Sequence, residues 1–431
     1  MRVLFAAAEF VPLVSVGGLA EAAAGLVRAL RSMDIDVEVV LPDYSTTRLE
    51  RETVEDLDVP HWAAPATARN GHLEGIGRVT LVDVPGIRRG HPYVDEDGEG
   101  WPDNADRFFA FSAAVAALVE KRSPDVLHLN DWHTAATLGL LAEAPPTVLT
   151  IHTLGYQGWT SGGWLDRIVR GVDLFEAYGG TNPLAGAIQL ADRVIAVSPN
   201  YANEIRTPDG GSGLHTQLDA LGDRLVGIRN GIDVSLWDPA ADSAIAKTFS
   251  PADPSGKDAC RVALLDEIGW LDTSIPTVGM VTRLVDQKGL EFALEAAKFA
   301  DGVPFRLVLL GSGDRWLADW ARWLAGEFPD SVWFHDGYDV ALAHRIFAGS
   351  DLLLMPSRFE PCGLAQMQAM QYGTIPIVTP VGGLVDTVID ADADRANGTG
   401  FVSRTVDAAG TVDALHRAVR AWRHRRRRQG I

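Results

Sequence analysis

The sequence predicts an α/β protein built from two doubly wound domains, each a mainly parallel sheet with helices on its faces. Its 431 residues exceed the roughly 250–300 that one hydrophobic core usually serves, which favours two domains. Short apolar runs alternate with longer amphipathic stretches along the chain, as strand–helix–strand units do. A polar, proline-containing segment from Trp237 to Gly256 interrupts this alternation and separates two sets of strands.

The expected strands lack a clean alternation of apolar and polar residues, which is typical of strands buried on both faces in parallel sheets. Between them, residues 19–33 and 290–300 place apolar side chains at helical spacing and predict amphipathic helices. The first set of expected strands covers residues 2–8, 37–42, 79–85, 125–129, 147–152, 193–198 and 225–230. The second set covers residues 277–281, 305–311, 331–337, 352–357 and 375–380.

The interrupting segment places the domain boundary at residue 240, with one domain over 1–240 and the other over 241–431. In open α/β sheets, ligands bind outside the carboxyl ends of the strands. Two such domains facing each other would bring these ends to a central cleft. Residues that directly follow strands are therefore the first candidates for chemistry.

Composition and charge argue against several classes of function. The net charge of −19 disfavours nucleic acid or an anionic membrane as the main partner, and the basic run 423–428 is read as a solvated tail. No apolar stretch approaches the roughly 18–20 residues of a membrane span, and Glu9 falls too early for a signal peptide. Cys260 and Cys362 cannot form a disulfide framework. We therefore expect a soluble, cytoplasmic enzyme.

A glycine-containing loop from Glu9 to Glu21 follows the first expected strand. Gly17 and Gly18 allow a ligand to approach the backbone closely, and the helix that follows offers free amide groups to an anion. Tight-turn packing would explain the two glycines equally well. The loop is therefore a candidate site and no more.

Two loops of the second strand set carry charged residues. Arg283 and Lys288 leave a strand on a turn that leads into a helix. Two cations at such a point can neutralise a diphosphate leaving group, which then needs no proton donor. Glu360 and Gly363 follow a later strand, where the carboxylate can hold sugar hydroxyls and a helix opened by Gly363 can bind phosphate. Solvated loop residues would give the same pattern, so each signal is weak alone.

The remaining motifs favour structural roles. Cys362 has no histidine near it in sequence to activate it, so buried packing is the better interpretation. His133 and His152 come close to the ends of adjacent strands, but no spacing completes a zinc site. The acidic run 390–394 lacks a full calcium-loop pattern, and Asn230 belongs to a simple turn signal. No metal site is expected.

Taken together, these segments resemble the glycogen and starch synthase family of retaining glycosyltransferases, in order and over nearly the whole chain. The most specific segments are SRFEPCGL, which contains Glu360, and RLVDQKGL, which contains Lys288. The other matching segments are EFVPLVSVGGLAE, HPYVDEDGEGWPDNADRF, NDWHT, TIHTLGYQG, VSPNYANEI, NGID with WDP, LGSGD and VGGLVDTV.

The resemblance implies the GT-B fold, in which two Rossmann-like domains close on a nucleotide-diphosphate sugar. It also implies that neither a metal nor another cofactor is required. It assigns the acceptor side to residues 1–240 and the nucleotide donor side to residues 241–431.

The resemblance further implies which residues act. Arg283 and Lys288 match the basic pair on the donor diphosphate. Glu360 matches the glutamate that holds the donor sugar, and His152 matches the histidine against the reaction centre. The implied substrate-binding residues are Glu9, Ser15, Gly17, Gly18 and Glu21 in the glycine loop, Asp131 on the acceptor side, Asn230 in its turn, Tyr338 beside the base, and Cys362, Gly363, Leu364 and Ala365 around the phosphate-binding helix start.

Four positions depart from the family pattern. They are Ser15 in place of a lysine, Glu21 in place of an aspartate, Thr153 in place of an asparagine, and Ala365 in place of a threonine or serine. Losing a phosphate-binding lysine removes about 1.5–3 kcal/mol of charge-assisted bonding. The stretch 157–191 is also shorter than the family's, and the chain stops soon after Trp422. These departures favour a changed donor and a smaller acceptor.

Four interpretations remain. The leading one is a retaining transferase with a non-standard nucleotide-diphosphate donor and a small sugar acceptor, in specialised metabolism. A rival is a pseudo-glycosyltransferase that couples a nucleotide-activated cyclitol to a small acceptor. The others are ADP-glucose-dependent glycogen synthesis and a non-catalytic sugar- or nucleotide-binding relative. The sequence leaves the base, the transferred group, the acceptor and the oligomeric state open.

Overall fold

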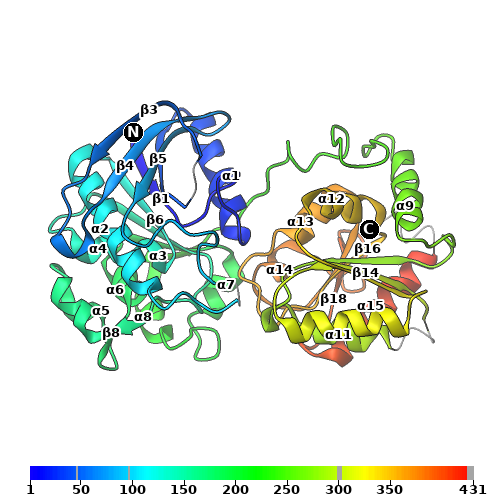
Figure 1. Cartoon of the computed structure of the whole chain (residues 1–431). Coiled ribbons are helices and arrows are strands. Elements are labelled where there is room, and N and C mark those ends of the chain that lie inside the picture. Colours follow the sequence, from blue (N-terminus) through cyan, green and yellow to red (C-terminus); the bar gives the residue numbers. More distant parts are fainter. Residues whose placement is uncertain (45–46, 96–97, 299–302, 425–431) are drawn as a thin grey trace. The chain divides into compact units, whose positions relative to one another are not determined.

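The computed structural model describes residues 1–44, 47–95, 98–298 and 303–424 (Figure 1). The chain divides into two compact units, Met1–Gly231 and Ile232–Ile431, and both are α/β. Most of the basic run 423–428, which was read as a solvated tail, lies outside the described residues.

A nine-stranded sheet forms the centre of the first unit. Its order is β12 (Leu225–Gly227), β11 (Arg193–Ala196), β7 (Thr147–Ile151), β6 (Val126–Asn130), β1 (Arg2–Ala6), β2 (Asp36–Pro42), β5 (Gly77–Asp83), β4 (Thr67–Leu73) and β3 (Glu50–Asp56). The strands from β12 to β5 are parallel, and Val3 of β1 is the register partner of Val37 on one side and Val126 on the other. Every expected strand of the first set is present.

The far edge of this sheet differs from the expectation of parallel strands. β4 pairs antiparallel with β5, and β3 pairs antiparallel with β4. The sequence of β3, ERETVED, is almost entirely exposed. An edge strand of this kind shows charged side chains to water, so it carries none of the apolar pattern from which a buried strand is predicted.

Helices pack on this sheet through small apolar residues. α1 (Gly18–Ser32) buries Leu19, Ala23 and Val27 against β1, β2 and β5. The other helices are η1 (His61–Ala63), α2 (Asn104–Arg122), α3 (Trp132–Ala135), α4 (Thr137–Leu140), η2 (Gly162–Arg167), α5 (Val172–Phe175), α6 (Pro183–Leu190), α7 (Pro199–Glu204), α8 (His215–Ala220) and η3 (Gly222–Arg224). A small separate sheet joins β8 (Thr160–Ser161), β10 (Gly180–Thr181) and β9 (Glu176–Ala177).

The second unit has a six-stranded, fully parallel sheet. Its order is β15 (Val332–Asp336), β14 (Arg306–Gly311), β13 (Thr277–Val281), β16 (Leu352–Met355), β17 (Ile375–Val378) and β18 (Phe401–Val402). The chain starts at β13, builds outward to β15, and then returns to add β16, β17 and β18 on the other side. The strand order therefore reverses between β13 and β16, which is where open α/β sheets bind ligands.

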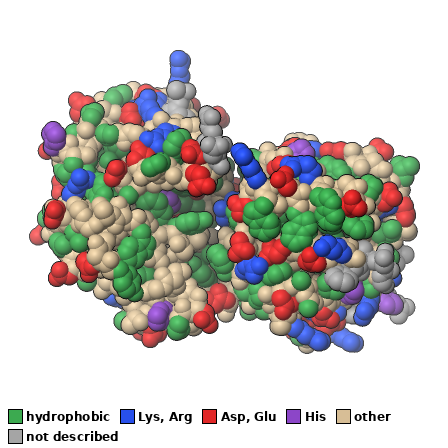
Figure 2. Space-filling model, turned by 60° about the horizontal axis from the view of Figure 1, so that its bottom comes forward, with side chains coloured by type: hydrophobic (Ala, Val, Ile, Leu, Met, Phe, Trp, Pro, Cys, Tyr) green, Lys and Arg blue, Asp and Glu red, His purple; other side chains and the backbone are tan. Residues whose placement is uncertain are grey.

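Helices cover both faces of this second sheet (Figure 1). On one face, α10 (Leu290–Ala297), α11 (Arg315–Glu327) and α15 (Ala408–Arg423) share one core. On the other face lie α9 (Ser255–Glu267), α12 (Val340–Gly349), α13 (Ala365–Gln371) and α14 (Gly382–Thr387). α11 leaves Trp316 and Trp323 about half exposed. Hydrophobic side chains lie among charged ones on the face of this unit seen in Figure 2. No helix among the described residues has the length and apolar character that a membrane crossing requires.

The segment after Gly231 packs on the second unit. Trp237 stacks on His344 with ring centroids 4.1 Å apart, and Asp242 Oδ2 lies 2.7 Å from His344 Nδ1. The hydroxyl of Tyr372 donates to the same Asp242 oxygen at 2.6 Å. The division after Gly231 therefore precedes the boundary predicted at residue 240. The acceptor and donor roles assigned to the two halves stay predictions.

Candidate active site

In the second unit, Lys288 and Glu360 meet where the strand order reverses. Lys288 ends the short helix η4 (Asp286–Lys288) after β13, and Glu360 lies in the loop after β16. Lys288 Nζ donates to Glu360 Oε2 at 2.6 Å, and Ser357 Oγ donates to the same oxygen at 3.0 Å. No described residue hydrogen-bonds the other oxygen, Oε1. One carboxylate oxygen is thus held by the protein, and the other is available to a ligand.

Two glycines let the loops approach closely enough to form this pair. Gly289 has φ +59°, and a Cβ there would lie 2.1 Å from the carbonyl oxygen of Pro356. Gly382 has φ +42°, and a Cβ there would lie 1.9 Å from the carbonyl oxygen of Glu360. Larger side chains would push these loops apart. The Lys288–Glu360 contact therefore depends on backbone positions that only glycine fills without strain.

Arg283 lies in the same loop as Lys288 and is exposed. Its Nη2 donates to Gln287 Oε1 at 3.4 Å, and it forms no ion pair with any described residue. Gln287 in turn donates to the carbonyl oxygen of Phe359 at 3.2 Å and accepts from the amide of Arg358 at 2.9 Å. The loops after β13 and β16 are cross-braced, and one uncompensated cation projects from them.

The residues expected to bind phosphate are arranged differently from the prediction. α13 begins at Ala365 with Leu364 as its N-cap, so Gly363 does not open the helix. Gly363 has φ +73° and forms the turn before it. Cys362 is buried, and the side-chain amide of Gln366 donates to the carbonyl oxygens of Cys362 and Gly363 at 3.1 and 3.0 Å. The helix starts later because Gly363 takes a left-handed conformation.

Tyr338 follows β15 and is 76% exposed. It comes directly after Gly337, whose amide donates to the carbonyl oxygen of Gly311 at the end of β14. Tyr338 is therefore at the same edge of the sheet as Arg283 and Lys288. An exposed ring at this edge is compatible with stacking on a base, and that role stays a prediction.

In the first unit, Asn130, Asp131 and His152 form a polar group at the ends of β6 and β7, in which Asn130 and Asp131 are buried and His152 is half-buried. Asp131 has φ +54° and accepts the backbone amides of His152 at 2.7 Å and Thr153 at 3.4 Å. His152 Nε2 lies 3.0 Å from Asn130 Oδ1. Asn130 Nδ2 donates to the carbonyl oxygen of Ala6, so its Oδ1 is the acceptor that faces the imidazole. The proton of His152 is thereby placed on Nε2, and Nδ1 is left as an acceptor.

Burial disfavours the charged forms of these groups. Desolvation lowers the pKa of His152 to about 3, and the nearby His128 lowers it further. Desolvation raises the pKa of Asp131 to about 7, although the two backbone amides oppose this and the charge of Glu9 adds to it. The pKa of His133 is likewise lowered to about 3 by desolvation and then by Arg107. A neutral imidazole and a carboxyl that titrates near neutrality are the chemical resources of this edge.

Glu9 organises the glycine loop itself. Its Oε2 accepts the backbone amides of Val16 at 2.6 Å and Gly17 at 2.9 Å, and its Oε1 accepts the hydroxyl of Tyr93 at 2.7 Å. Gly17 is the N-cap of α1, and Gly18 is its first residue. One amide at this helix start is therefore already occupied by a carboxylate.

The other predicted residues of the first unit are less enclosed. Ser15 is exposed, and Glu21 is half-buried in the first turn of α1. Asn230 is half-buried after β12, and its amide donates to the carbonyl oxygen of Val197 at 3.2 Å. No cation therefore projects from the position of Ser15.

The sequence did not single out three residues that hold the candidate side chains in place. They are Asn130, which orients His152, Ser357, which bonds Glu360, and Tyr93, which bonds Glu9. All three lie inside quoted motifs, so their position was visible but their pairing was not. Pairing depends on contacts between residues 22 and 84 positions apart for two of them, which no local pattern encodes.

The described residues contain no group of three or more His, Cys, Asp or Glu that could hold a metal ion. His133 is buried among Tyr93, Phe108 and Trp132, with ring centroids 4.3 to 5.0 Å away. The acidic run at 390–394 is engaged in protein contacts, since Asp390 and Asp392 both pair with Arg417 at 3.0 Å.

Two family models match the chain. The starch synthase catalytic domain matches residues 2–220, and glycosyl transferases group 1 matches residues 270–430. The first model thus lies within the first unit, and the second lies within the second unit.

Curated relatives match over almost the whole chain. The glycogen synthase of Halorhodospira halophila is 41% identical over 441 residues, covering 99% of this chain and 92% of the relative. The glycogen synthase of Alkalilimnicola ehrlichii is 41% identical over 451 residues, covering 98% and 92%.

Solved structures match in the same way. The catalytic domain of starch synthase IV from Arabidopsis thaliana, bound to ADP and acarbose, superposes with a TM-score of 0.88 at 33% identity. The match covers 100% of this chain and 94% of that one. Sucrose-phosphate synthase from Thermosynechococcus elongatus, at 20% identity and a TM-score of 0.64, shares the fold.

Proposed function

Because this chain belongs to the glycogen and starch synthase family of glycosyltransferases, we propose that it transfers glucose from ADP-glucose to an α-glucan and retains the anomeric configuration. Relatives of about 40% identity are named glycogen synthase, and starch synthase IV was solved with ADP and acarbose. These findings favour the third interpretation of the sequence over the leading one. They give no support to a specialised donor or to a pseudo-glycosyltransferase.

The observation that carries the proposal is the Lys288–Glu360 pair at the strand-order reversal, with the unpaired Arg283 beside it. Two cations and one carboxylate in this place match a nucleotide-diphosphate sugar. Arg283 and Lys288 would hold the diphosphate, and Glu360 Oε1 would accept a hydroxyl of the donor sugar. Tyr338 at the same edge would stack on the base.

Charge stabilisation is the main catalytic work of this arrangement. The bond between the anomeric carbon and the phosphate oxygen breaks, the diphosphate takes the electron pair, and positive charge develops on the sugar. Lys288 and Arg283 stabilise the leaving group, and the carboxylate of Glu360 stabilises the sugar cation. The leaving phosphate accepts the proton of the attacking hydroxyl on the same face, which retains the configuration. A second carboxylate nucleophile, as in retaining glycosidases, is not needed.

The first unit would supply the acceptor side with neutral groups. His152 Nδ1 is an acceptor at the end of β7, because Asn130 fixes the proton on Nε2. It can therefore accept a hydroxyl of the acceptor sugar as a neutral group. Asp131 orients this histidine through its backbone amide.

The test is direct transfer by the purified chain. With ADP-glucose and glycogen we expect ADP release and α-linked extension, read by proton NMR coupling constants, and little turnover with UDP-glucose. Inversion of configuration, or a trapped glycosyl–Glu360 adduct, would contradict the mechanism.

One observation favours a different donor, namely Ser15 in place of a loop cation. The same experiment decides this point when it is repeated with a panel of nucleotide sugars. Faster turnover of another donor than of ADP-glucose would support the leading interpretation of the sequence, which is a transferase with a non-standard donor.

A further inference from the structure

A second polar site lies at the opposite edge of the first unit's sheet, where its central strands begin. A pocket of about 360 Å³ is lined there by the start of β1 at Arg2, the start of β5 at Arg78, and Pro124 before β6. Strand β1 runs from this pocket toward the glycine loop and rises roughly 3.3 Å per residue. The length of the strand therefore separates the pocket from the candidate active site of the same unit. The pocket belongs to none of the motifs that carry the glycosyltransferase resemblance.

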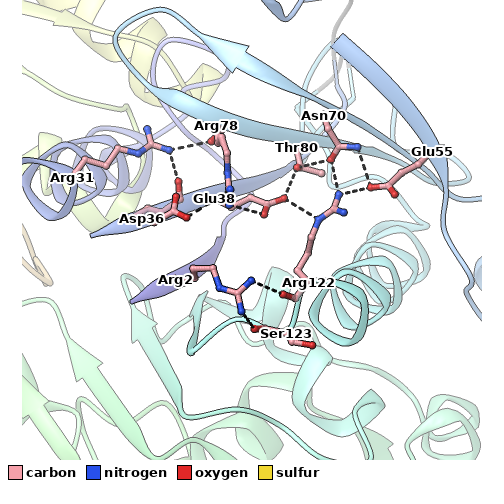
Figure 3. A network of polar contacts seen from close by, with 11 residues as sticks. Arg2, Arg31, Asp36, Glu38, Glu55, Asn70, Arg78, Thr80, Arg122 and Ser123 are labelled. Carbon is pink, nitrogen blue, oxygen red and sulfur yellow. Dashed lines mark hydrogen bonds and ion pairs between the residues drawn. The ribbon is translucent and has the colours of Figure 1, made fainter. Parts of the chain in front are cut away.

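The floor of the pocket is a hydrogen-bonded network that holds its polar groups in place (Figure 3). Glu38 is buried, and its carboxylate receives Thr80 Oγ1 at 2.8 Å and Arg78 Nη2 at 3.2 Å. Arg122 lies 3.5 Å from the same carboxylate and donates to Asn70 Oδ1 at 3.0 Å. The arginines of this floor are therefore neutralised and fixed by carboxylates.

Two further arginines of the pocket are not neutralised. Arg2 donates to the backbone carbonyl oxygens of Arg122 at 3.3 Å and Ser123 at 2.8 Å, as Figure 3 shows, and forms no ion pair with a described residue. The side chain of Arg51 is exposed and forms neither a hydrogen bond nor an ion pair with any described residue. A pocket with two uncompensated guanidinium groups is unusual in a chain whose net charge is −19.

The backbone at Arg51 adopts a strained conformation. β3 and β4 change register between Glu50 and Thr53, and Arg51, within this bulge, has φ +53°. A non-glycine residue in this conformation is strained, and it persists where the surroundings require it. Bulges redirect side chains at sites of function. Gly71 on β4 permits the bulge, because a Cβ there would lie 2.8 Å from the carbonyl oxygen of Glu50.

We propose that this pocket binds a phosphate monoester of a small polyhydroxylated compound. Arg51 and Arg2 would bind the phosphate, since the guanidinium group matches its oxygens in pairs. Glu38, Thr53 and Asn70 would face the hydroxyl groups, because carboxylate, hydroxyl and amide groups both order and distinguish them. The volume of about 360 Å³ fits a molecule of a few carbon atoms.

Calorimetry of the full chain tests the proposal with ribose 5-phosphate and glycerol 3-phosphate as probes. We expect both esters to bind, and ribose and glycerol without phosphate to bind at least tenfold more weakly. Inorganic phosphate alone separates the two sources of the anion: binding as tight as that of the esters would overturn the role of the hydroxyl-facing groups.

Matched variants locate the binding. Arg51→Glu should weaken ester binding tenfold or more, and it should fold normally because this side chain is exposed and forms no hydrogen bond or ion pair with described residues. Arg48→Glu reverses an exposed charge of the same chain segment outside the pocket and should leave binding unchanged. Lys288→Ala should also leave it unchanged. If Lys288→Ala lost binding while Arg51→Glu kept it, the ester would bind at the donor site and the proposal would be overturned. The proposal would also be overturned if no ester bound at 10 mM, a concentration that corresponds to a binding free energy on the order of 2–3 kcal/mol.

Discussion

Asp131 of the first unit and Glu360 of the second are buried to the same extent, 6% and 5% exposed, yet they are prepared for opposite tasks. Glu360 has a lysine ammonium 2.6 Å away. Among the described residues, the carboxyl of Asp131 is bonded only by the two backbone amides of His152 and Thr153, and its pKa is raised to about 7 by desolvation. Burial alone therefore does not decide the state of a carboxyl at a strand end. The decisive difference is whether a cation accompanies it.

This difference divides the chemistry of the two sheets. The edge of the first sheet holds a neutral imidazole and a carboxyl whose pKa burial raises, whereas the edge of the second sheet holds a lysine–glutamate ion pair and an exposed guanidinium group. A leaving diphosphate and a sugar cation need charge, whereas hydroxyl recognition next to a cation is served better by neutral groups. Five changes test this division.

The largest effect is expected for Glu360→Gln. The amide keeps the shape and can still accept a hydroxyl, but it removes the negative charge that stabilises the sugar cation. Turnover should fall by about a hundred- to a thousandfold, while ADP affinity changes little, as kinetics and calorimetry together will show. The matched control is Glu327→Gln, an exposed position at the end of α11. Equal losses in turnover and ADP binding would mean that Glu360 serves only to place Lys288.

The second test removes the charge of Asp131. The pKa of Asp131 is raised in the folded state, so its contribution to stability is fully present below about pH 3.8 and is lost as the pH rises through about 7. Asp131→Asn keeps the acceptor for both amides and cannot ionise. The variant should be more stable than the wild type at pH 8 by about 2–4 kcal/mol and similar at low pH.

Urea unfolding at pH 5 and pH 8 measures this difference. The histidines act in the opposite direction: the pKa of His152 is lowered to about 3, so its contribution is present above about pH 6.5 and is lost as the pH falls toward 3. The Asn variant should therefore gain stability as the pH rises from 5 to 7. If the stability of the variant equals that of the wild type at every pH, the pKa of Asp131 is not raised in the folded state.

Lys288→Ala should weaken ADP binding by about tenfold or more, the equivalent of one charge-assisted bond. Calorimetry of ADP binding measures it. Lys298→Ala, at the C-cap of α10, is the control because Lys298 pairs with Glu295 of the same helix and lies over the ring of Trp320, and it has no ion pair with Glu360. If Lys288→Ala bound ADP as tightly as the wild type, Lys288 would not hold the diphosphate.

A smaller effect is expected for Ser15→Lys. Ser15 is exposed, and an exposed charge contributes about 0–1 kcal/mol. The KM for ADP-glucose should change by no more than about fivefold, as steady-state rates will show. A larger gain in affinity would mean that the first unit is also built to take a charge.

The smallest effect should come from chelation. The charged groups at the strand ends of the second sheet are side chains and not metal ions, so EDTA should leave turnover unchanged. Activity that is lost to EDTA and restored by magnesium would show that the cations of Arg283 and Lys288 do not suffice.

Much of this architecture could be predicted from the sequence. The apolar runs located the parallel strands of both sheets except β18, and the fold class of two Rossmann-like domains is confirmed by the sheet topology and by starch synthase IV. The glycosyltransferase class is confirmed as well. The roles of His152, Arg283, Lys288 and Glu360 stay predictions, which the variants above address.

Other features were out of reach. The β3–β4 edge was missed because its residues face water and carry no apolar period. The start of α13 was misplaced at Gly363, since a left-handed glycine cannot be told from a helix start by composition. The preference for an unusual donor rested on Ser15 and three other substitutions. The relatives, which are named glycogen synthase, do not support it.

The stacking of Trp237 on His344 bears on how genes of this kind can recombine. An exchange that joins the first half of one relative to the second half of another preserves each core only if the crossover precedes Ile232. A crossover at residue 241 would bring a foreign segment to a surface shaped for Trp237, with Asp242 still required by His344 and Tyr372. Viable hybrids, whether natural or engineered, should therefore have their junctions just after Gly231, and junctions a few codons later should be depleted among them.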